Sequence, residues 1–226
     1  MSETNPLYKL FYKEDPYLNF PLKEDAKLEG WHSDHPVFKE LILQFLPKTI
    51  IEVGSFKGAS AINMASIIKE FELEATIFCV DTFLGGVENW DLGCPEIENS
   101  GWTYDMLDWK NGRPDIYSTF MTNVINASVE DIIVPIPNTS LNGYKLLEKQ
   151  NITADLIYID GSHEEEDCYN DIFYYQHLLT KNKGIIFGDD YGSTGVKQAV
   201  DLYVDTYVMK EDFFIYDNNF WIIRNK

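Results

Sequence analysis

The sequence is poor in cysteine and in basic residues. Its three cysteines, Cys79, Cys94 and Cys168, form no C-x-x-C pair and leave an odd number, which argues against a disulfide framework and against a structural zinc site. Lysine and arginine together number 18 against 37 aspartates and glutamates, so the formal net charge is −19. A chain this acidic is not expected to bind nucleic acid or an anionic membrane surface.

Long apolar runs are also missing. The N-terminal stretch MSETNPLYKLFYKEDPYLNF lacks the uninterrupted apolar region of a signal peptide, and no run approaches the ~20 residues of a membrane span. We therefore expect a cytoplasmic protein without membrane insertion. Hydrophobic residues still make up 45% of the 226 residues, and aromatic residues 15%. This composition excludes a disordered chain and suits one large domain with a sizeable core.

Segments with helical apolar spacing alternate with short apolar runs that are typical of buried strands. Strands are predicted at 49–53, 76–80, 131–136, 155–159 and 184–187, and helices at 37–46, 59–71, 114–125, 140–150, 164–179 and 193–207. The tail DFFIYDNNFWIIRN predicts two more strands around a turn at Asp217-Asn218-Asn219. The alternation predicts an α/β fold, a doubly wound, mostly parallel seven-stranded sheet with an antiparallel C-terminal hairpin.

Two segments fall outside this alternation. Residues 1–35 are polar and aromatic with three prolines, and they predict an N-terminal arm or lid before a domain that spans residues 36–226. Residues 84–113 hold five glycines and three tryptophans with little periodicity. We interpret them as a long insertion, because long loops in compact domains are usually functional.

The first predicted strand runs into a glycine-containing turn, IEVGSFKG, at residues 51–58. Gly54 allows close approach of a ligand, and the helix that follows Gly58 offers unpaired N–H groups. The middle glycine of the dinucleotide-binding pattern is absent, which argues against a dehydrogenase. The pattern E-x-G-x-x-x-G resembles that of S-adenosylmethionine (SAM) methyltransferases, and a tight turn without a ligand is the alternative. The candidate cofactor contacts in and after this turn are Glu52, Gly54, Ser55, Gly58 and Ser60.

The next two strand ends carry further polar residues. Asp81 and Thr82 end the second strand, and an acid at this place can accept hydrogen bonds from ribose hydroxyls. Its alternative role is to cap a turn or helix. The third strand ends in PIPNTS, where Asn138, Thr139 and Ser140 can reach an adenine edge or can cap the helix at 140–150.

The stretch GIIFGDDYG, residues 184–192, leads a buried strand directly into two acids, Asp189 and Asp190. Two like charges about 4 Å apart repel by roughly 4 kcal/mol at an effective dielectric near 20. Asp160 ends the preceding strand, so three carboxylates meet at one sheet edge if the two strands are neighbours. A cation among them would offset the repulsion, and oxygen ligands favour Mg²⁺, with Mn²⁺ or Ca²⁺ as alternatives, over zinc. We predict that these three acids bind a divalent ion.

His163 follows Asp160 by three residues and is a candidate general base. A divalent ion lowers the pKa of a bound hydroxyl, and an imidazole takes up protons near neutral pH. The alternative is a residue that only begins the acidic helix EEED, whose carboxylates suit the helix dipole.

Five stretches together carry a family resemblance: GWHSDHPVF, IIEVGSFKGASAINMA, VDTFLGG, DLIYIDGSH and GIIFGDDYG with GVKQAVD. In this order they resemble class I, SAM-dependent and metal-dependent O-methyltransferases of macrolide-sugar and cephalosporin biosynthesis. The resemblance covers residues 30 to about 205. More loosely, the chain is similar to the methyltransferase domain of rhamnosyltransferases from large algal viruses.

The resemblance implies a Rossmann-like methyltransferase fold, SAM as donor, and Mg²⁺ or Mn²⁺ as metal. In the macrolide-sugar enzymes the metal is held by an acid after strand four and an acidic pair after strand five, which match Asp160, Asp189 and Asp190. A histidine three residues past the first ligand serves as base there and matches His163. Asp160 is thus a candidate for three roles: it is expected to bind the metal, to contact the cofactor and to take part in catalysis.

The expected acceptor is a sugar or glycan, with a terminal rhamnose or another deoxyhexose as the specific expectation. Aromatic rings suit the C–H face of a pyranose, and the candidates are Trp31, His32, Trp90, Trp102, Trp109 and Tyr191. Loop packing is the alternative role for these rings. A small phenol or catechol acceptor, and a non-catalytic SAM-binding module, remain as alternative functions. A homo-oligomer and a place within a larger glycosyltransferase chain are both compatible with the sequence.

Overall fold

The computed structural model of the chain describes residues 4–90 and 104–225. Seven strands form one sheet in the order β3-β2-β1-β4-β5-β7-β6. They are β1 (Thr49–Val53), β2 (Thr76–Asp81), β3 (Ile133–Pro137), β4 (Leu156–Ile159), β5 (Ile185–Gly188), β6 (Phe213–Tyr216) and β7 (Phe220–Arg224). The first five strands are parallel, and β7 runs antiparallel to both β5 and β6. The predicted fold class and the C-terminal hairpin are confirmed.

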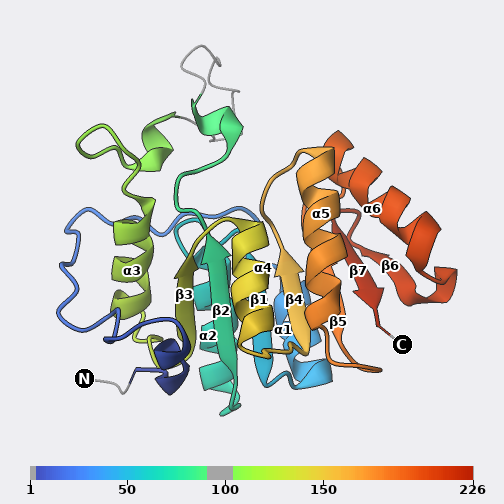
Figure 1. Cartoon of the computed structure of the whole chain (residues 1–226), viewed down its shortest axis with the longest axis horizontal. Coiled ribbons are helices and arrows are strands. Elements are labelled where there is room, and N and C mark those ends of the chain that lie inside the picture. The colour runs from blue at the N-terminus through green and yellow to red at the C-terminus, as the bar shows by residue number, and fades with distance from the viewer. Residues whose placement is uncertain (1–3, 91–103, 226) are drawn as a thin grey trace.

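Helices cover both faces of the sheet (Figure 1). They are α1 (Pro36–Phe45), α2 (Ala59–Glu70), α3 (Ile116–Asn126), α4 (Ser140–Lys149), α5 (Glu165–Tyr175) and α6 (Thr194–Tyr207). Buried side chains of α1, α2 and α3 form one apolar core on one face, and those of α4, α5 and α6 form another on the opposite face. The central strands are therefore buried on both sides, as their uninterrupted apolar runs predicted.

Three predicted boundaries shift by two residues or more, each for a local reason. The helix predicted at 164–179 ends at Tyr175 and continues as a 3₁₀ turn, Gln176–Leu178. The strand predicted from residue 131 begins at Ile133, because the N–H groups of Ile132 and Ile133 both donate to the carbonyl of Val129 in a turn. The helix predicted from residue 114 begins at Ile116, because Asp115 is not helical and its N–H donates to the carbonyl of Leu107 at 3.0 Å.

The arm packs along the edge of the sheet. Asn5 is buried and donates through Nδ2 to Thr76 Oγ1 at 2.9 Å. The hydroxyls of Tyr12 and Tyr17 donate to the carbonyls of Pro135 and Ile133 at 2.8 and 3.1 Å. The arm then crosses towards the carboxyl ends of the strands, where residues 29–33 lie. Residues 4–35 thus belong to the packed structure.

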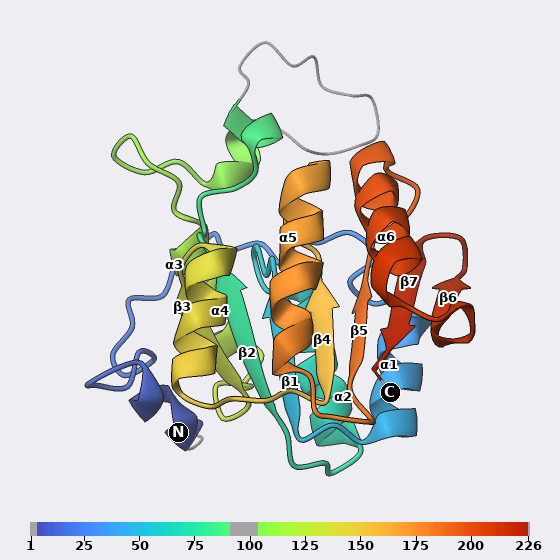
Figure 2. The same ribbon diagram turned by 45° about the vertical axis from the view of Figure 1, so that its right-hand side comes forward.

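The carboxyl ends of the parallel strands all point to the same side of the molecule, towards residues 84–90 and 104–113 of the insertion (Figure 2). The chain order reverses between β1 and β4, since β2 and β3 lie on one side of β1 and β4 lies on the other. Ligands of open α/β sheets bind at such a switch point. No helix within residues 4–90 and 104–225 has the length and apolar character needed to cross a bilayer.

Candidate active site

A cavity of about 300 Å³ opens at the switch point. Three segments line it: the turn after β1, the ends of β4 and β5, and the arm. The lining residues are Gly54, Ser55, Phe56, Ala59 and Ser60, then Asp160, His163, Asp189, Asp190 and Ser193, and finally Glu29–Ser33. The predicted metal ligands and base therefore share one cavity with Gly54, Ser55 and Ser60, whereas Glu52 and Gly58 of the predicted glycine turn do not line it.

Gly54 joins the two halves of this cavity. Its φ is +87°, and a Cβ atom on it would lie 2.0 Å from the carbonyl oxygen of Asp160. The Asp160 N–H donates to Val53 at 2.8 Å, so the two strand ends are in direct contact. Glycine is required here to let β1 and β4 approach each other, in addition to any ligand contact.

Glu52 is fully buried beneath the turn. Its carboxylate accepts hydrogen bonds from the hydroxyls of Ser55 and Ser60, each at 2.5 Å. Burial raises the pKa of Glu52 to about 7, although both serine hydroxyls act in the opposite direction. All three residues hold the turn in place from inside, and their contact with a cofactor stays a prediction.

The raised pKa predicts a pH-dependent stability. Folded Glu52 keeps a proton that the unfolded chain releases, so its contribution is present below pH 4.5 and is lost as the pH rises through 7. Without added ligand, we expect the unfolding free energy of the natural chain, relative to Glu52→Gln, to fall by about 3 kcal/mol over that window. Urea denaturation of both proteins at several pH values measures the difference. A pH-independent difference would contradict the assignment.

Asp81 lies at the end of β2 and ties the turn to the next loop. Its Oδ2 accepts from the N–H groups of Ser55 and Phe56 at 2.9 and 2.7 Å, and its Oδ1 accepts from Phe83 at 2.6 Å. Burial raises its pKa, and these backbone bonds lower it in part. The capping role is thus present. A carboxylate has about four acceptor sites, so one remains for a ribose hydroxyl, which stays a prediction. Thr82 accepts from the N–H of Leu84 at 3.2 Å.

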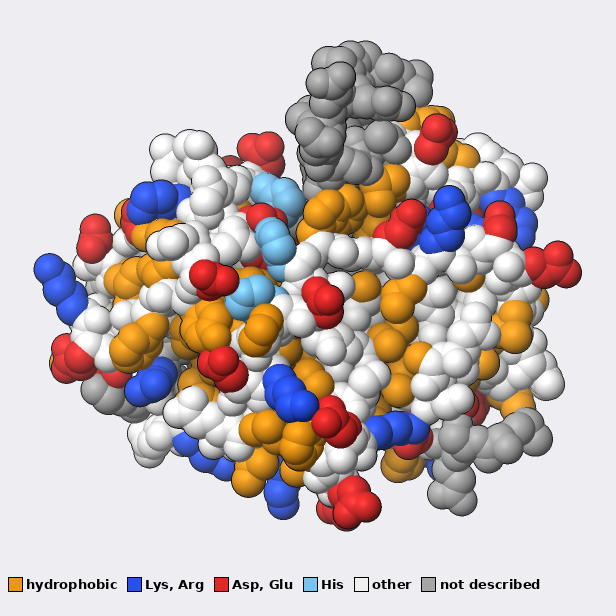
Figure 3. All heavy atoms as spheres, turned by 180° about the vertical axis from the view of Figure 1, so that it is seen from behind, with side chains coloured by type: hydrophobic (Ala, Val, Ile, Leu, Met, Phe, Trp, Pro, Cys, Tyr) orange, Lys and Arg blue, Asp and Glu red, His pale blue; other side chains and the backbone are white. Residues whose placement is uncertain are grey.

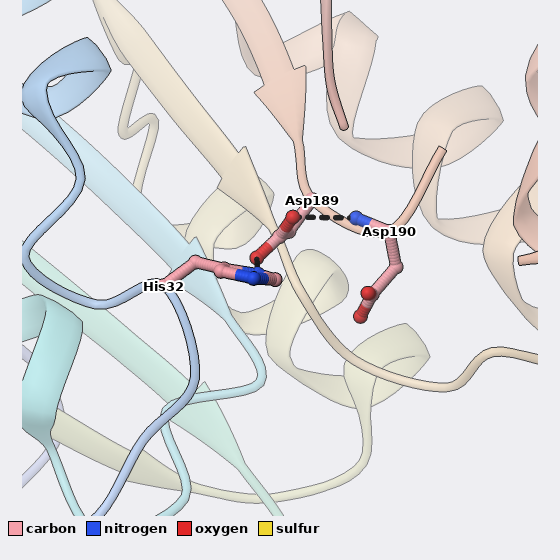
Figure 4. A group of neighbouring side chains, drawn as sticks. All are labelled: His32, Asp189 and Asp190. Carbon is pink, nitrogen blue, oxygen red and sulfur yellow. Dashed lines mark hydrogen bonds and ion pairs between the residues drawn. The ribbon is translucent and has the colours of Figure 1, made fainter. Parts of the chain in front are cut away.

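The acidic residues form two overlapping groups. Within the described residues, possible ligand atoms lie within 4.8 Å of one another in His32, Asp189 and Asp190, and again in Asp160, His163 and Asp190. Asp190 belongs to both groups. Figure 4 shows His32 reaching Asp189 from the arm, with the Asp190 carboxylate beside this pair. On the back face of the molecule, histidine and acidic side chains lie close together at the surface (Figure 3).

Asp189 is 3% exposed and has partners that the sequence did not predict. Its Oδ2 lies 3.0 Å from His32 Nδ1, and its Oδ1 accepts from the Asp190 N–H at 2.6 Å and from the side-chain amide of Asn219. Asn219 lies in the turn between β6 and β7, and its carbonyl accepts from the Tyr191 N–H at 2.9 Å. The turn was predicted, but its contact with the site depends on β7 lying beside β5.

His163 and Asp160 lie on the opposite side of Asp190. His163 Nε2 is 3.0 Å from Asp190 Oδ2, and the Tyr158 hydroxyl donates to Asp160 Oδ2 at 3.0 Å. Burial, and then the charges of Asp189 and Asp190, raise the pKa of Asp160 well above its ordinary value. Burial and Asp190 also raise the pKa of Asp189. Asp160 and Asp189 therefore both resist ionisation.

Ser140 begins α4 and lies outside the cavity lining. Its hydroxyl donates to Asp171, a buried acid of α5 whose pKa burial raises to about 7. Thr139 caps α4, since its Oγ1 accepts from the N–H of Asn142 at 3.3 Å. An aspartate in the middle of an expected helix gave no signal of this contact.

Only part of the predicted acceptor set lines the cavity. Trp31 and His32 do so. Trp90 packs against Trp109 with ring centres 4.9 Å apart, and the Tyr191 hydroxyl donates to Asp201 at 2.6 Å. An acceptor role for these last three aromatic residues stays a prediction. Trp102 lies outside the described residues.

Comparison with protein families finds one match, a model described as a methyltransferase domain, over residues 51–191. A search of curated proteins finds no match.

Solved structures give the same fold. The O-methyltransferase NovP matches with a TM-score of 0.64 at 15% identity, over 86% of this chain and 80% of NovP. CalS11, a calicheamicin methyltransferase, matches with a TM-score of 0.58 at 15% identity, over 87% and 80%. TomG, a Streptomyces achromogenes O-methyltransferase of tomaymycin synthesis solved with SAM, matches with a TM-score of 0.57 at 12% identity, over all of both chains.

The family match begins inside β1 and ends one residue after the acidic pair, so it contains the glycine turn, Asp81, Asp160 and His163 as well. It covers more than half of the chain. We conclude that this chain belongs to the family of methyltransferase domains.

Proposed function

We propose that the chain is a SAM-dependent O-methyltransferase that acts on a sugar hydroxyl, such as that of a terminal deoxyhexose, with the help of a divalent cation. The observation that carries the proposal is the single cavity that joins the glycine turn to Asp160, Asp189, Asp190 and His163. A methyl donor and an activated hydroxyl must meet in one place, and this cavity provides it. The shared fold of NovP and TomG supports transfer to oxygen.

The group of acids formed by Asp160, Asp189 and Asp190, here called the acid centre, fits a hard cation such as Mg²⁺ or Mn²⁺. Carboxylate oxygens from adjacent strand ends are the donors that these ions prefer. The raised pKa values of Asp160 and Asp189 reflect burial and mutual repulsion, which a cation would offset. Asp160, Asp189 and Asp190 would hold the ion. When bound, it supplies charge that makes a nearby hydroxyl more acidic.

The turn after β1 fits the donor. SAM supplies a methyl group on a positively charged sulfur. Gly54 and Ser55 line the cavity next to Asp160. A SAM molecule bound at this turn would therefore lie close to the acid centre. The N-terminus of α2 follows directly, where Ala59 and Ser60 also line the cavity. Unpaired N–H groups there attract a carboxylate such as that of the methionyl part.

His163 is placed to remove the proton of the acceptor. A carboxylate only accepts hydrogen bonds, so the contact with Asp190 places the imidazole hydrogen on Nε2 and the lone pair on Nδ1. Nδ1 would take the hydroxyl proton as the acceptor oxygen bonds to the methyl carbon; the S–CH₃ bond would break, and neutral S-adenosylhomocysteine would leave. The positive imidazolium that results is stabilised by Asp190, which keeps the base oriented throughout.

The acceptor would lie against the arm. Trp31 offers an aromatic face in the cavity wall, and such a face suits the C–H side of a pyranose.

The test is mass spectrometry of rhamnose-terminated glycans incubated with SAM and Mg²⁺, with and without EDTA. We expect one added methyl group per acceptor, loss of transfer with EDTA, and recovery when Mg²⁺ is restored. Transfer that survives chelation would contradict the metal assignment. Methylation of catechols but not of sugars would contradict the acceptor class. Binding of S-adenosylhomocysteine without transfer to any acceptor would favour a non-catalytic module.

A further inference from the structure

A fully buried lysine lies in the middle of the glycine turn. The Lys57 side chain is 1% exposed, and its Nζ lies 2.5 Å from Glu29 Oε2 and 3.2 Å from Asp108 Oδ1. The sequence SFKG gave no reason to expect burial, since lysines are almost never fully buried unless they are paired. The mechanism above does not use this charge.

The partners of Lys57 form a balanced cluster, which we call the Lys57 cluster: Lys57, Lys23, Glu29, Asp108 and Thr119. Asp108 Oδ2 lies 3.1 Å from Lys23 Nζ and accepts from Thr119 Oγ1 at 2.5 Å. Burial alone would raise the pKa of Asp108, but Thr119 and the two lysines outweigh it and hold the pKa below its ordinary value. Two cations and two carboxylates leave the cluster neutral.

The cluster joins four segments: the arm, the turn after β1, the end of the insertion and α3, which carries Thr119. Glu29 belongs to the arm and directly precedes Gly30, Trp31 and His32, which line the cavity. Asp108 belongs to the end of the insertion, and Lys57 to the turn after β1. The arm also lies close to α2, since a Cβ on Gly30 would be 2.7 Å from the Cβ of Ala59. Its far end contacts Asp189 through His32.

The Lys57–Glu29 ion pair and the contact between His32 and Asp189 thus hold the two ends of residues 29–32 at the cavity wall. Replacing a whole buried ion pair with apolar side chains of similar volume is often neutral for stability, so burial at this place does not by itself require the Lys57–Glu29 pair. What the charge does provide is directional contact with one residue of the arm and one of the insertion.

We propose that Lys57 is a positioning residue that fixes the arm and the end of the insertion over the glycine turn. The arm, which would contact the acceptor, and the turn, which would contact SAM, are thereby held in a fixed position relative to each other. The inference rests on the proposed function in taking the cavity to hold SAM. Release of the bound product S-adenosylhomocysteine then requires the arm to leave Lys57.

The experiment compares Lys57→Met, Glu29→Gln and the double variant. For Lys57→Met we expect trypsin cleavage after Lys27, in the exposed arm, to be about tenfold faster, since cleavage tracks the open population. We expect S-adenosylhomocysteine to dissociate about tenfold faster in stopped-flow measurements, because loss of a buried pair acts on release. Lys39→Met, which removes an exposed pair with Glu70 at 45% and 59% exposure, is the matched control and should change neither rate.

The double variant separates positioning from stability. Adding Glu29→Gln removes the unpaired carboxylate, so the melting temperature should recover in part while release stays fast. Release that slows in parallel with recovered stability would overturn the proposal. Unchanged arm cleavage and release in Glu29→Gln would also overturn it, even if Lys57→Met fails to fold. If the natural chain does not bind S-adenosylhomocysteine, the proposed function fails, and the cleavage rate alone decides the role of Lys57.

Discussion

Asp189→Asn is expected to lower kcat/KM of the proposed methyl transfer about 10³-fold. This factor corresponds to about 4 kcal/mol of lost transition-state stabilisation. Asparagine keeps the shape of the side chain and an oxygen that can accept from the Asp190 N–H. It removes the charge that would hold a cation. Asp189 contacts His32 and Asn219 rather than the glycine turn, so the affinity for S-adenosylhomocysteine should stay within about threefold. Kinetics and calorimetry measure the two quantities.

Asp217→Asn is the matched control for this change. Asp217 lies in the neighbouring hairpin turn with its side chain 72% exposed, and it contacts His35 at 3.3 Å. The same loss of charge there should leave turnover unchanged. If Asp189→Asn lowers S-adenosylhomocysteine affinity as much as turnover, the cofactor and metal assignments are not separate, and the proposed division of the cavity is wrong.

Gly54→Ala is expected to be the most disruptive single substitution in the turn. The added methyl group would lie 2.0 Å from the Asp160 carbonyl oxygen and 2.7 Å from Gly161 Cα, and these backbone atoms cannot move without separating β1 from β4. The residue also has a positive φ of +87°. We expect a loss of about 4 kcal/mol or more in unfolding free energy, together with loss of S-adenosylhomocysteine binding. Thermal unfolding and calorimetry test both.

Gly112→Ala isolates the cost of the backbone conformation. Gly112 has a φ of +77°, close to that of Gly54, but nothing lies within 4 Å of an added Cβ. Only strain of about 1 kcal/mol should result. If both alanine variants lose the same stability, the close contact between Gly54 and Asp160 is not what requires glycine.

The elements of the fold could be predicted because each carries its own signal. The apolar run of β1 and the helical spacing of α2 are local patterns, and Asp217 and Asn218 have φ values of +52° and +59°, as the hairpin turn required. The errors in the prediction lie at the ends of elements. For example, β3 begins two residues later than predicted, because a backbone turn at Val129 precedes it. Such turns depend on hydrogen bonds that periodicity does not encode.

The residues of the candidate site were predictable to the extent that they follow strands. Asp160 and Asp189 end neighbouring strands, so sheet topology alone brings them to one edge. His32, Asn219 and Glu29 come from segments without periodic signals. Their places depend on how the arm crosses the domain and on β7 pairing beside β5.

By itself, the sequence determined which residues form strands and helices, and which polar groups stand at the strand ends, since both follow from contacts a few residues apart. The tertiary structure alone decided that His32 and Asn219 contact Asp189 and that Lys57 is buried between the arm and the insertion. Those contacts join residues 28 to 157 positions apart, and only the packing of the whole chain brings such residues together.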